Sequence, residues 1–75
     1  MIIPVSEFRT GESGKITSIE TYELKVAMMR MGLVPGEIFE MAEIAPLGDP
    51  ISVRIGETKI AIRKKEAGKI FAEKL

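Results

Sequence analysis

Met31-Gly32-Leu33-Val34-Pro35-Gly36 is the stretch of this chain that decides how it folds. A second stretch, Ala45-Pro46-Leu47-Gly48-Asp49-Pro50-Ile51, follows after about the length of one strand. In both stretches glycine can adopt positive φ without a steric cost, and proline presets φ at about −65°. The two stretches therefore indicate a small, rigid domain with well-specified loops. The residues predicted to shape its turns are Gly32, Pro35, Gly36, Pro46, Gly48 and Pro50.

A helix is predicted directly before the first stretch. Thr21 is a suitable N-cap because its hydroxyl can accept a hydrogen bond from a free backbone N–H, and Glu23 in the first turn favours the helix dipole. Apolar residues at helical spacing predict one core-facing side, formed by Leu24, Ala27, Met28 and Met31. Gly32 then suits the left-handed position that ends a helix, with Leu33 folding back onto the last turn.

Five strands are predicted, at residues 14–19, 37–44, 51–55, 59–63 and 70–72. Alternation of apolar and polar residues makes the third and fourth a hairpin. The apolar residues of 37–44 do not share one face, so its inward side stays open. Closure of a sheet removes its exposed edges, so short strands with Gly/Pro turns favour a mainly β fold: a small, five-stranded barrel with one inserted α-helix.

Composition limits the classes of function. The 75 residues predict one domain, and Cys and His are both absent. Eleven basic residues balance eleven acidic ones, so no nucleic-acid partner is expected. The first seven residues lack a basic segment and a long apolar segment, and the longest apolar run is Val26–Met29. We therefore expect neither a secretory signal nor direct membrane insertion, and a cytoplasmic location.

Several segments together resemble the FeoA family, the small accessory proteins of bacterial ferrous iron uptake. They are Gly11-x-x-Gly14-x-Ile16, Met28-x-x-Met31-Gly32-Leu33-x-Pro35-Gly36, Ala45–Ile51, Ile60–Ala67 and Ile70. The resemblance runs nearly from end to end and implies an SH3-like five-stranded barrel. It further implies a non-enzymatic, cytoplasmic protein that binds and regulates FeoB, a membrane GTPase that moves Fe²⁺.

Two alternatives stay open. The same domain resembles the C-terminal module of diphtheria-toxin-repressor-type metalloregulators, which implies an accessory domain of such a regulator. A small nucleic-acid-binding barrel is the other alternative, and the neutral charge argues against it because such binding depends on basic residues.

No catalytic, metal or cofactor site is predicted. Iron sites typically use His, carboxylate or thiolate ligands, and the carboxylates here form no ligand motif. Without His or Cys, the familiar nucleophile–base pairs are missing as well. Asp49 is interpreted as a turn residue that binds nearby backbone, and the basic run Arg63-Lys64-Lys65 as a solvated turn.

The helix is the better candidate for recognition. Val26 and Met29 fall off its predicted core side, and methionine suits adaptable contacts. With Leu33, Leu47 and Asp49 they are predicted to form one partner-binding surface that joins the helix end to the second Gly/Pro stretch. The sequence leaves open whether the chain forms a homodimer, through this surface or an unpaired strand, and whether it activates or inhibits transport.

Overall fold

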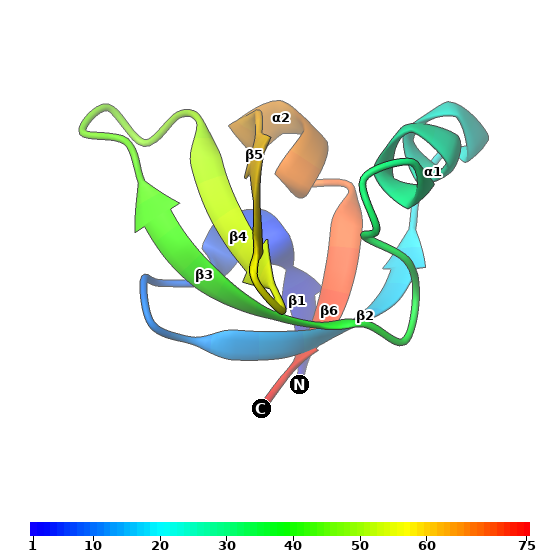
Figure 1. The fold of residues 1–75 in the computed structure, drawn as a ribbon, viewed down its shortest axis with the longest axis horizontal. Helices are drawn as coiled ribbons and strands as arrows, with labels where there is room; N and C mark the ends of the chain where they lie inside the picture. The colour runs from blue at the N-terminus through cyan, green and yellow to red at the C-terminus, as the bar shows by residue number, and fades with distance from the viewer.

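One antiparallel sheet of six strands forms the framework of the protein, which a computed structural model describes over residues 1–75 (Figure 1). The strand order is β1-β6-β2-β3-β4-β5. In chain order the elements are strand β1 (Ile2–Pro4), the 3-10 turn η1 (Val5–Glu7), β2 (Ser13–Ile19), helix α1 (Tyr22–Met29), β3 (Ile38–Ile44), β4 (Ile51–Ile55), β5 (Thr58–Ile62), the short helix α2 (Lys64–Ala67) and β6 (Ile70–Lys74).

The mainly β, SH3-like class is confirmed, while the prediction of five strands in a closed barrel is wrong in two respects. A sixth strand, β1, pairs with β6 with Ile3 opposite Ala72. The edge strands β1 and β5 do not pair with each other, so the sheet curls without closing. Three residues ending on Pro4 are too short to show a strand period, and β1 exists because β6 offers it a free edge.

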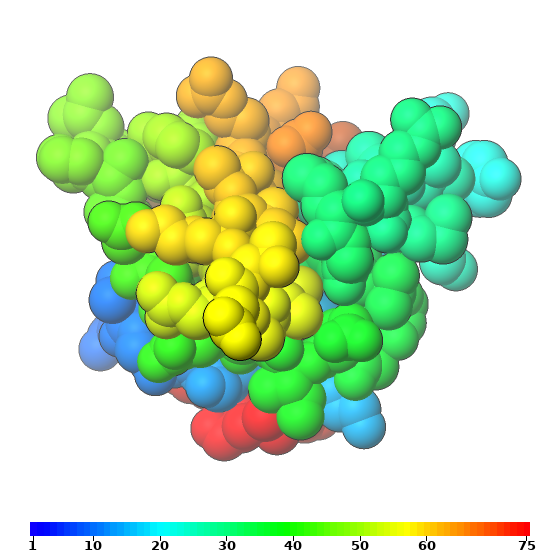
Figure 2. Space-filling view, viewed as in Figure 1, coloured from blue at the N-terminus to red at the C-terminus, as the bar shows by residue number.

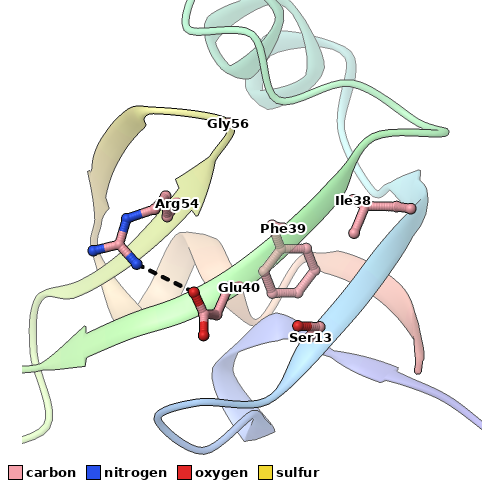
Figure 3. A pocket seen from close by; sticks show the side chains of 6 residues that line it. All are labelled: Ser13, Ile38, Phe39, Glu40, Arg54 and Gly56. Atoms are coloured by element: carbon pink, nitrogen blue, oxygen red, sulfur yellow. Dashed lines mark hydrogen bonds and ion pairs between the residues drawn. The ribbon is translucent and has the colours of Figure 1, made fainter.

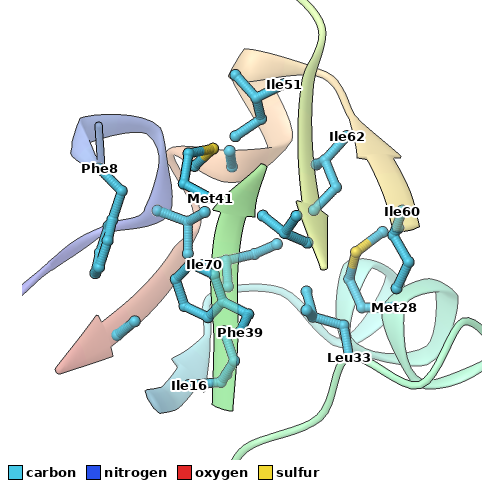
Figure 4. Packing of buried hydrophobic residues seen from close by; sticks show 14 of the residues in the cluster. Phe8, Ile16, Met28, Leu33, Phe39, Met41, Ile51, Ile60, Ile62 and Ile70 are labelled. Carbon is cyan, nitrogen blue, oxygen red and sulfur yellow. The ribbon is translucent and has the colours of Figure 1, made fainter. Parts of the chain in front are cut away.

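The core inside the curled sheet is entirely apolar: fifteen hydrophobic residues are buried there and no polar side chain is (Figure 4). Phe8 and Phe39 meet edge to face, with ring centroids 5.1 Å apart. Gly14 lies directly against this pair, and a Cβ at that position would stand 2.7 Å from the Phe8 ring. Glycine is therefore required here for close packing, not for an unusual backbone angle.

Strand β3 shows why its sequence pattern was ambiguous. Phe39 and Met41 are buried, whereas Ile38 and Ile44 are exposed. The pairing of β3 with β4 shifts by one residue between Met41 and Glu43. Because this irregularity changes the phase of the alternation, Ile44 pairs with the buried Ile51 and turns toward the inward side at the end of the strand, where it stays 39% exposed. The β4–β5 hairpin follows its predicted alternation, and its inward residues are Ile51, Val53, Ile60 and Ile62.

Both chain ends lie at one pole of the molecule, and α1 and α2 lie at the other (Figure 1). Strands β1 and β6 carry the two ends, and the backbone N–H of Lys74 donates to the carbonyl of Met1. Helix α2 and the loop between β3 and β4 share the pole with α1. This arrangement leaves the helical pole free of chain termini.

Candidate interaction surface

The local sequence positions α1 as predicted at both of its ends. The Thr21 hydroxyl accepts from the backbone N–H of Leu24 at 3.2 Å, which caps the first turn. At the other end, the N–H of Leu33 donates to the carbonyl of Met28, and the N–H of Gly32 donates to that of Met29. With Gly32 at φ +91°, these bonds make a Schellman motif, which satisfies carbonyls that a helix end otherwise leaves free.

The side of α1 that faces the core is narrower than the sequence predicts. Leu24 and Met28 are buried, whereas Ala27 is exposed and Met31 is 41% exposed. The helix lies against the rim of the sheet and contacts the core along one line of side chains at i and i+4. After Gly32 the chain turns back, and Leu33 takes the core position that Met31 would have held, as Figure 4 shows beside Met28.

A second apolar stripe lies on the opposite side of the same helix. Tyr22, Val26 and Met29 fall within about 60° of one another around the helix axis, and about 150° from the direction of Leu24 and Met28. Tyr22 is largely exposed, Met29 is 56% exposed and Val26 is half-buried. We call Tyr22, Val26 and Met29 the α1 stripe.

Two cations border the α1 stripe. Lys25 lies on one side of it and Arg30 on the other, as the helical spacing requires. Neither takes part in any of the four ion pairs of the structure. The exposed side of α1 is therefore an apolar line with a positive border.

The predicted joining of the helix end and the second Gly/Pro stretch is wrong. Leu33 is 1% exposed, because the Schellman motif folds it into the core. The loop that carries Leu47 and Asp49 lies at the end of the longest axis opposite to α1 (Figure 1). In Figure 2 the β3–β4 loop projects at the upper left and α1 at the right, with α2 and β5 between them.

The β3–β4 loop has its own anchoring. A turn places Gly48, at φ +87°, with its N–H on the carbonyl of Ala45 at 2.7 Å. Asp49 Oδ1 accepts from the backbone N–H of Lys64 at 2.9 Å, so this carboxylate binds the start of α2 and not its own loop. Leu47, at the tip, is 97% exposed.

The other predicted turn also forms. The N–H of Glu37 donates to the carbonyl of Val34 at 3.0 Å, and Gly36 has φ +98°. Pro35 and Gly36 thus occupy the two central positions of a turn in which the second requires positive φ, as in type II. The N–H of Gly36 also donates to the carbonyl of Ile16, which ties this turn to β2.

A groove of about 330 Å³ separates α1 from α2. Leu24 and Ala27 form its apolar part, and the remaining lining is polar or charged: Thr21, Glu23, Lys65, Glu66 and Lys69. The basic run Arg63-Lys64-Lys65 is exposed at the start of α2 and makes no ion pair. Because Glu23 and Glu66 face the same groove as Lys65 and Lys69, this region does not present a single charge.

A second hollow, of about 200 Å³, lies over β3 and β4 and is lined in part by Phe39 (Figure 3). Glu40 and Arg54 point toward each other across its rim, and Arg54 Nη1 donates to Glu40 Oε1 at 3.1 Å. Both side chains are about half exposed, so this pair contributes little stability. The hollow has no buried polar group that would fix a ligand.

Two surface carboxylates have lowered pKa values. Lys74 Nζ lies 2.8 Å from Glu12 Oε2, and its hydrogen bond, with help from the N–H of Arg9, lowers the pKa of Glu12. The hydrogen bond from Lys59 lowers the pKa of Glu43 in the same way. Both pairs stabilise the charged forms of these carboxylates.

No group of three or more carboxylates lies close enough together to hold a metal ion. No helix has the length and apolar character that crossing a bilayer requires. Tyr22 is the one residue of the α1 stripe that was not predicted from the sequence, although its spacing to Val26 and Met29, at i+4 and i+7, is visible there.

Comparison with known proteins gives a consistent result. A family model described as FeoA domain matches residues 3–74. A curated protein of Porphyromonas gingivalis strain W83, named Fe(2+) transport protein A/Fe(2+) transporter FeoB fusion protein, is 31% identical over 70 residues. That match covers 92% of this chain and only 8% of the fusion protein.

Solved structures agree with the family match. The crystal structure of an iron uptake regulatory protein (FeoA) superposes with a TM-score of 0.88 and 33% identity, covering 100% of this chain and 99% of the other. The repressor IdeR of T. acidophilum has a TM-score of 0.86, with 18% identity over 99% of this chain and 34% of the repressor. At that identity the repressor shares the fold alone.

Proposed function

This chain belongs to the FeoA domain family, and from that premise we propose that it is a non-enzymatic, cytoplasmic accessory protein that binds and regulates a FeoB-like membrane GTPase. The link to ferrous iron transport rests on the fusion relative, in which a segment similar to this chain is joined to an Fe²⁺ transporter. That relative is the single observation that carries the proposal. A domain that is covalently joined to a transporter in one protein is expected to act on the same kind of transporter when the two are separate.

The arrangement of the molecule supports an orientation for this contact. The chain ends lie at the pole opposite to α1, so a covalent connection at either end would leave the α1 stripe free to face the partner (Figure 1). Joining two domains in one chain raises their effective concentration and favours even a weak contact. A domain of this kind on a chain separate from its partner would make the same contact with lower occupancy.

The α1 stripe is the best candidate for the docking surface. Tyr22 and Met29 are exposed on the outer side of a helix whose opposite side already supplies the core contacts. An apolar line of this kind serves as an anchor when a partner covers it, and aromatic side chains are enriched at such anchors. Lys25 and Arg30 would meet acidic groups at the edge of the contact, which favours encounter more than affinity.

The α1 stripe contains some of the partner-binding residues predicted from the sequence and leaves out others. Val26 and Met29 remain proposed partner contacts, and Tyr22 joins them. Leu33 is excluded because it is buried. Asp49 stays a proposed contact on the β3–β4 loop, where one oxygen of its exposed carboxylate already accepts from the N–H of Lys64. Leu47 is a separate contact point that a partner would reach only by covering the helical pole as far as the β3–β4 loop.

Regulation requires that the partner has two states with different affinity for this chain, because a ligand shifts an equilibrium only through such a difference. A protein that binds the GTPase in one nucleotide state more tightly than in another would shift transport without performing chemistry itself. The docking surface then needs no catalytic group, which fits a chain whose buried side chains are all apolar.

The proposal is tested by calorimetric titration of the chain into the cytoplasmic region of its cognate GTPase. Wild type is expected to bind with a Kd of about tens of micromolar, or about −6 kcal/mol, and Met29→Asp to bind at least about tenfold more weakly. Ile38→Asp is the matched control, since Ile38 on β3 has the same 56% exposure as Met29. The absence of wild-type binding would refute the function, and equal binding by Met29→Asp would refute the surface.

A further inference from the structure

All of the oxidisable sulfur in this chain is in methionine, because it has five methionines and no cysteine. The five fall into two groups. Met28 and Met41 are core residues, 3% and 1% exposed, whereas Met1, Met29 and Met31 are 82%, 56% and 41% exposed. A dissolved oxidant can therefore reach three thioethers directly and two only when the core opens.

The three exposed methionines lie in different surroundings. Met29 is on the α1 stripe with Tyr22 and Val26. Met31 lies beyond the end of α1, in the turn that follows the helix, and is not part of the α1 stripe. Met1 is at the pole of the chain termini, opposite to α1 (Figure 1). Only Met29 is both open to an oxidant and part of the proposed docking surface.

We infer that Met29 is a reversible oxidation site through which peroxide weakens docking of the α1 stripe to its partner. This inference rests on the proposed function. The sulfur of Met29 attacks one oxygen of hydrogen peroxide, the O–O bond breaks and an S–O bond forms. The second oxygen leaves as water after proton transfer. The thioether loses two electrons, peroxide gains them, and a thiol-dependent sulfoxide reductase reverses the step.

The physical consequence is a change of polarity at the centre of an apolar contact. Methionine sulfoxide carries a strong hydrogen-bond acceptor where the thioether had almost none. If the partner covers Met29, that acceptor loses water without gaining a donor, and a buried polar group without a partner is costly. Oxidised Met31 and Met1 stay in solvent, so their oxidation leaves docking unchanged.

The modification is tested on the full chain treated with hydrogen peroxide. Trypsin cleavage after Lys25 and Arg30 places Met28 and Met29 in one peptide and Met31 and Met41 in the next, so fragment ions compare a core and a surface thioether within each peptide. We expect Met29 and Met31 to oxidise at least about tenfold faster than Met28 and Met41, since burial limits access. Equal rates for Met28 and Met29 would overturn the assignment of Met29 as the site.

The effect on docking is tested by titrating reduced and oxidised protein into the cytoplasmic region of the GTPase. Met29→Leu and Met31→Leu are matched variants, because leucine keeps the apolar volume and cannot be oxidised. Peroxide is expected to weaken binding about tenfold in wild type and in Met31→Leu, and to have no effect in Met29→Leu. A loss that persists in Met29→Leu, or oxidised wild type that binds like the reduced form, would overturn the inference alone.

Another outcome would refute the proposed function itself and not only the effect of Met29 oxidation. If reduced wild type and reduced Met29→Leu both fail to bind, the proposed function is refuted and the role of Met29 in docking falls with it. The peptide measurement does not use the partner, so it still decides whether Met29 is the preferred oxidation site.

Discussion

Replacing Gly14 by alanine tests the packing that holds the sheet together. The added Cβ would lie 2.7 Å from two ring atoms of Phe8 and 2.9 Å from one ring atom of Phe39, where ordinary contact distances are 3.4–4 Å. Both rings belong to one buried edge-to-face pair, so neither can move without disturbing the other. The substitution therefore forces a shift in the most tightly packed part of the core.

The magnitude follows from two opposing effects. Overpacking of a core by one methyl group costs about 1–3 kcal/mol, and the short distances at Gly14 place the cost in the upper part of that range. Alanine also lowers the conformational entropy of the unfolded chain, which raises the free energy of unfolding by about 0.4–1 kcal/mol. The net loss of unfolding free energy is then about 1–2 kcal/mol, which lowers Tm by about 5–15 °C in a domain of this size.

Urea unfolding followed by circular dichroism measures this loss, and an unchanged m-value would show that both proteins expose the same surface on unfolding. Gly68→Ala is the matched control. Gly68 has φ −68°, and its added Cβ would meet its neighbours at 3.5 Å or more, so stability should be unchanged or slightly higher. A Gly14→Ala protein within about 0.5 kcal/mol of wild type would refute the packing argument, because ordinary surface changes have that size.

Three further predictions concern the ends of elements and the charged surface. Asp49→Ala should lower the free energy of unfolding by about 0.5–1 kcal/mol in a urea titration, because the N–H of Lys64 loses its acceptor. Asp49→Asn keeps an acceptor oxygen and should therefore retain most of the wild-type stability. Gly32→Ala should cost about 1 kcal/mol through its positive φ, with no side-chain clash to add to it, and the same titration measures this loss. The lowered pKa of Glu12, caused first by the hydrogen bond from Lys74, gives a contribution that is present above the unfolded pKa and is lost as pH falls through the folded pKa. Glu12→Gln should therefore flatten the decline of Tm in acid, and an unchanged decline would mean that other groups cause it.

The features that could be predicted from sequence are those set by local chemistry. The Schellman motif that ends α1, with Gly32 at positive φ, and the turn at Pro35-Gly36 depend on a few adjacent residues, and both formed as expected. The β4–β5 hairpin also followed its alternation, because one side of each strand is buried and the other is not. In each case the deciding interactions join residues that are close in the chain.

The features that were predicted wrongly depend on how segments that are distant in the chain pack against one another. Strand β1 exists only through pairing with β6, and the width of the core-facing side of α1 depends on where the helix meets the sheet. The separation of the β3–β4 loop from α1 follows from the curl of the sheet, which no local pattern encodes (Figure 1). Leu33 was predicted to fold back onto the helix and to belong to the partner-binding surface, but the Schellman motif carries it into the core.

The candidate surface was therefore half visible in the sequence. Val26 and Met29 were found because they fall off the core side of the helix. Tyr22 shares their spacing, but it is the first helical residue and directly follows the N-cap Thr21, so it lies at the edge of the apolar pattern. A helix with apolar residues on two opposite sides is the signal that joins the three.

The central claim, that the α1 stripe is the docking surface for a FeoB-like GTPase, is tested most directly by NMR. Amide spectra of the ¹⁵N-labelled chain would be recorded with increasing amounts of the unlabelled cytoplasmic region of the GTPase. We predict that the largest shift changes or line broadening map to residues 22–32 and spare β1 and β6. Changes confined to the pole of the chain termini, or none at a saturating partner concentration, would contradict the account.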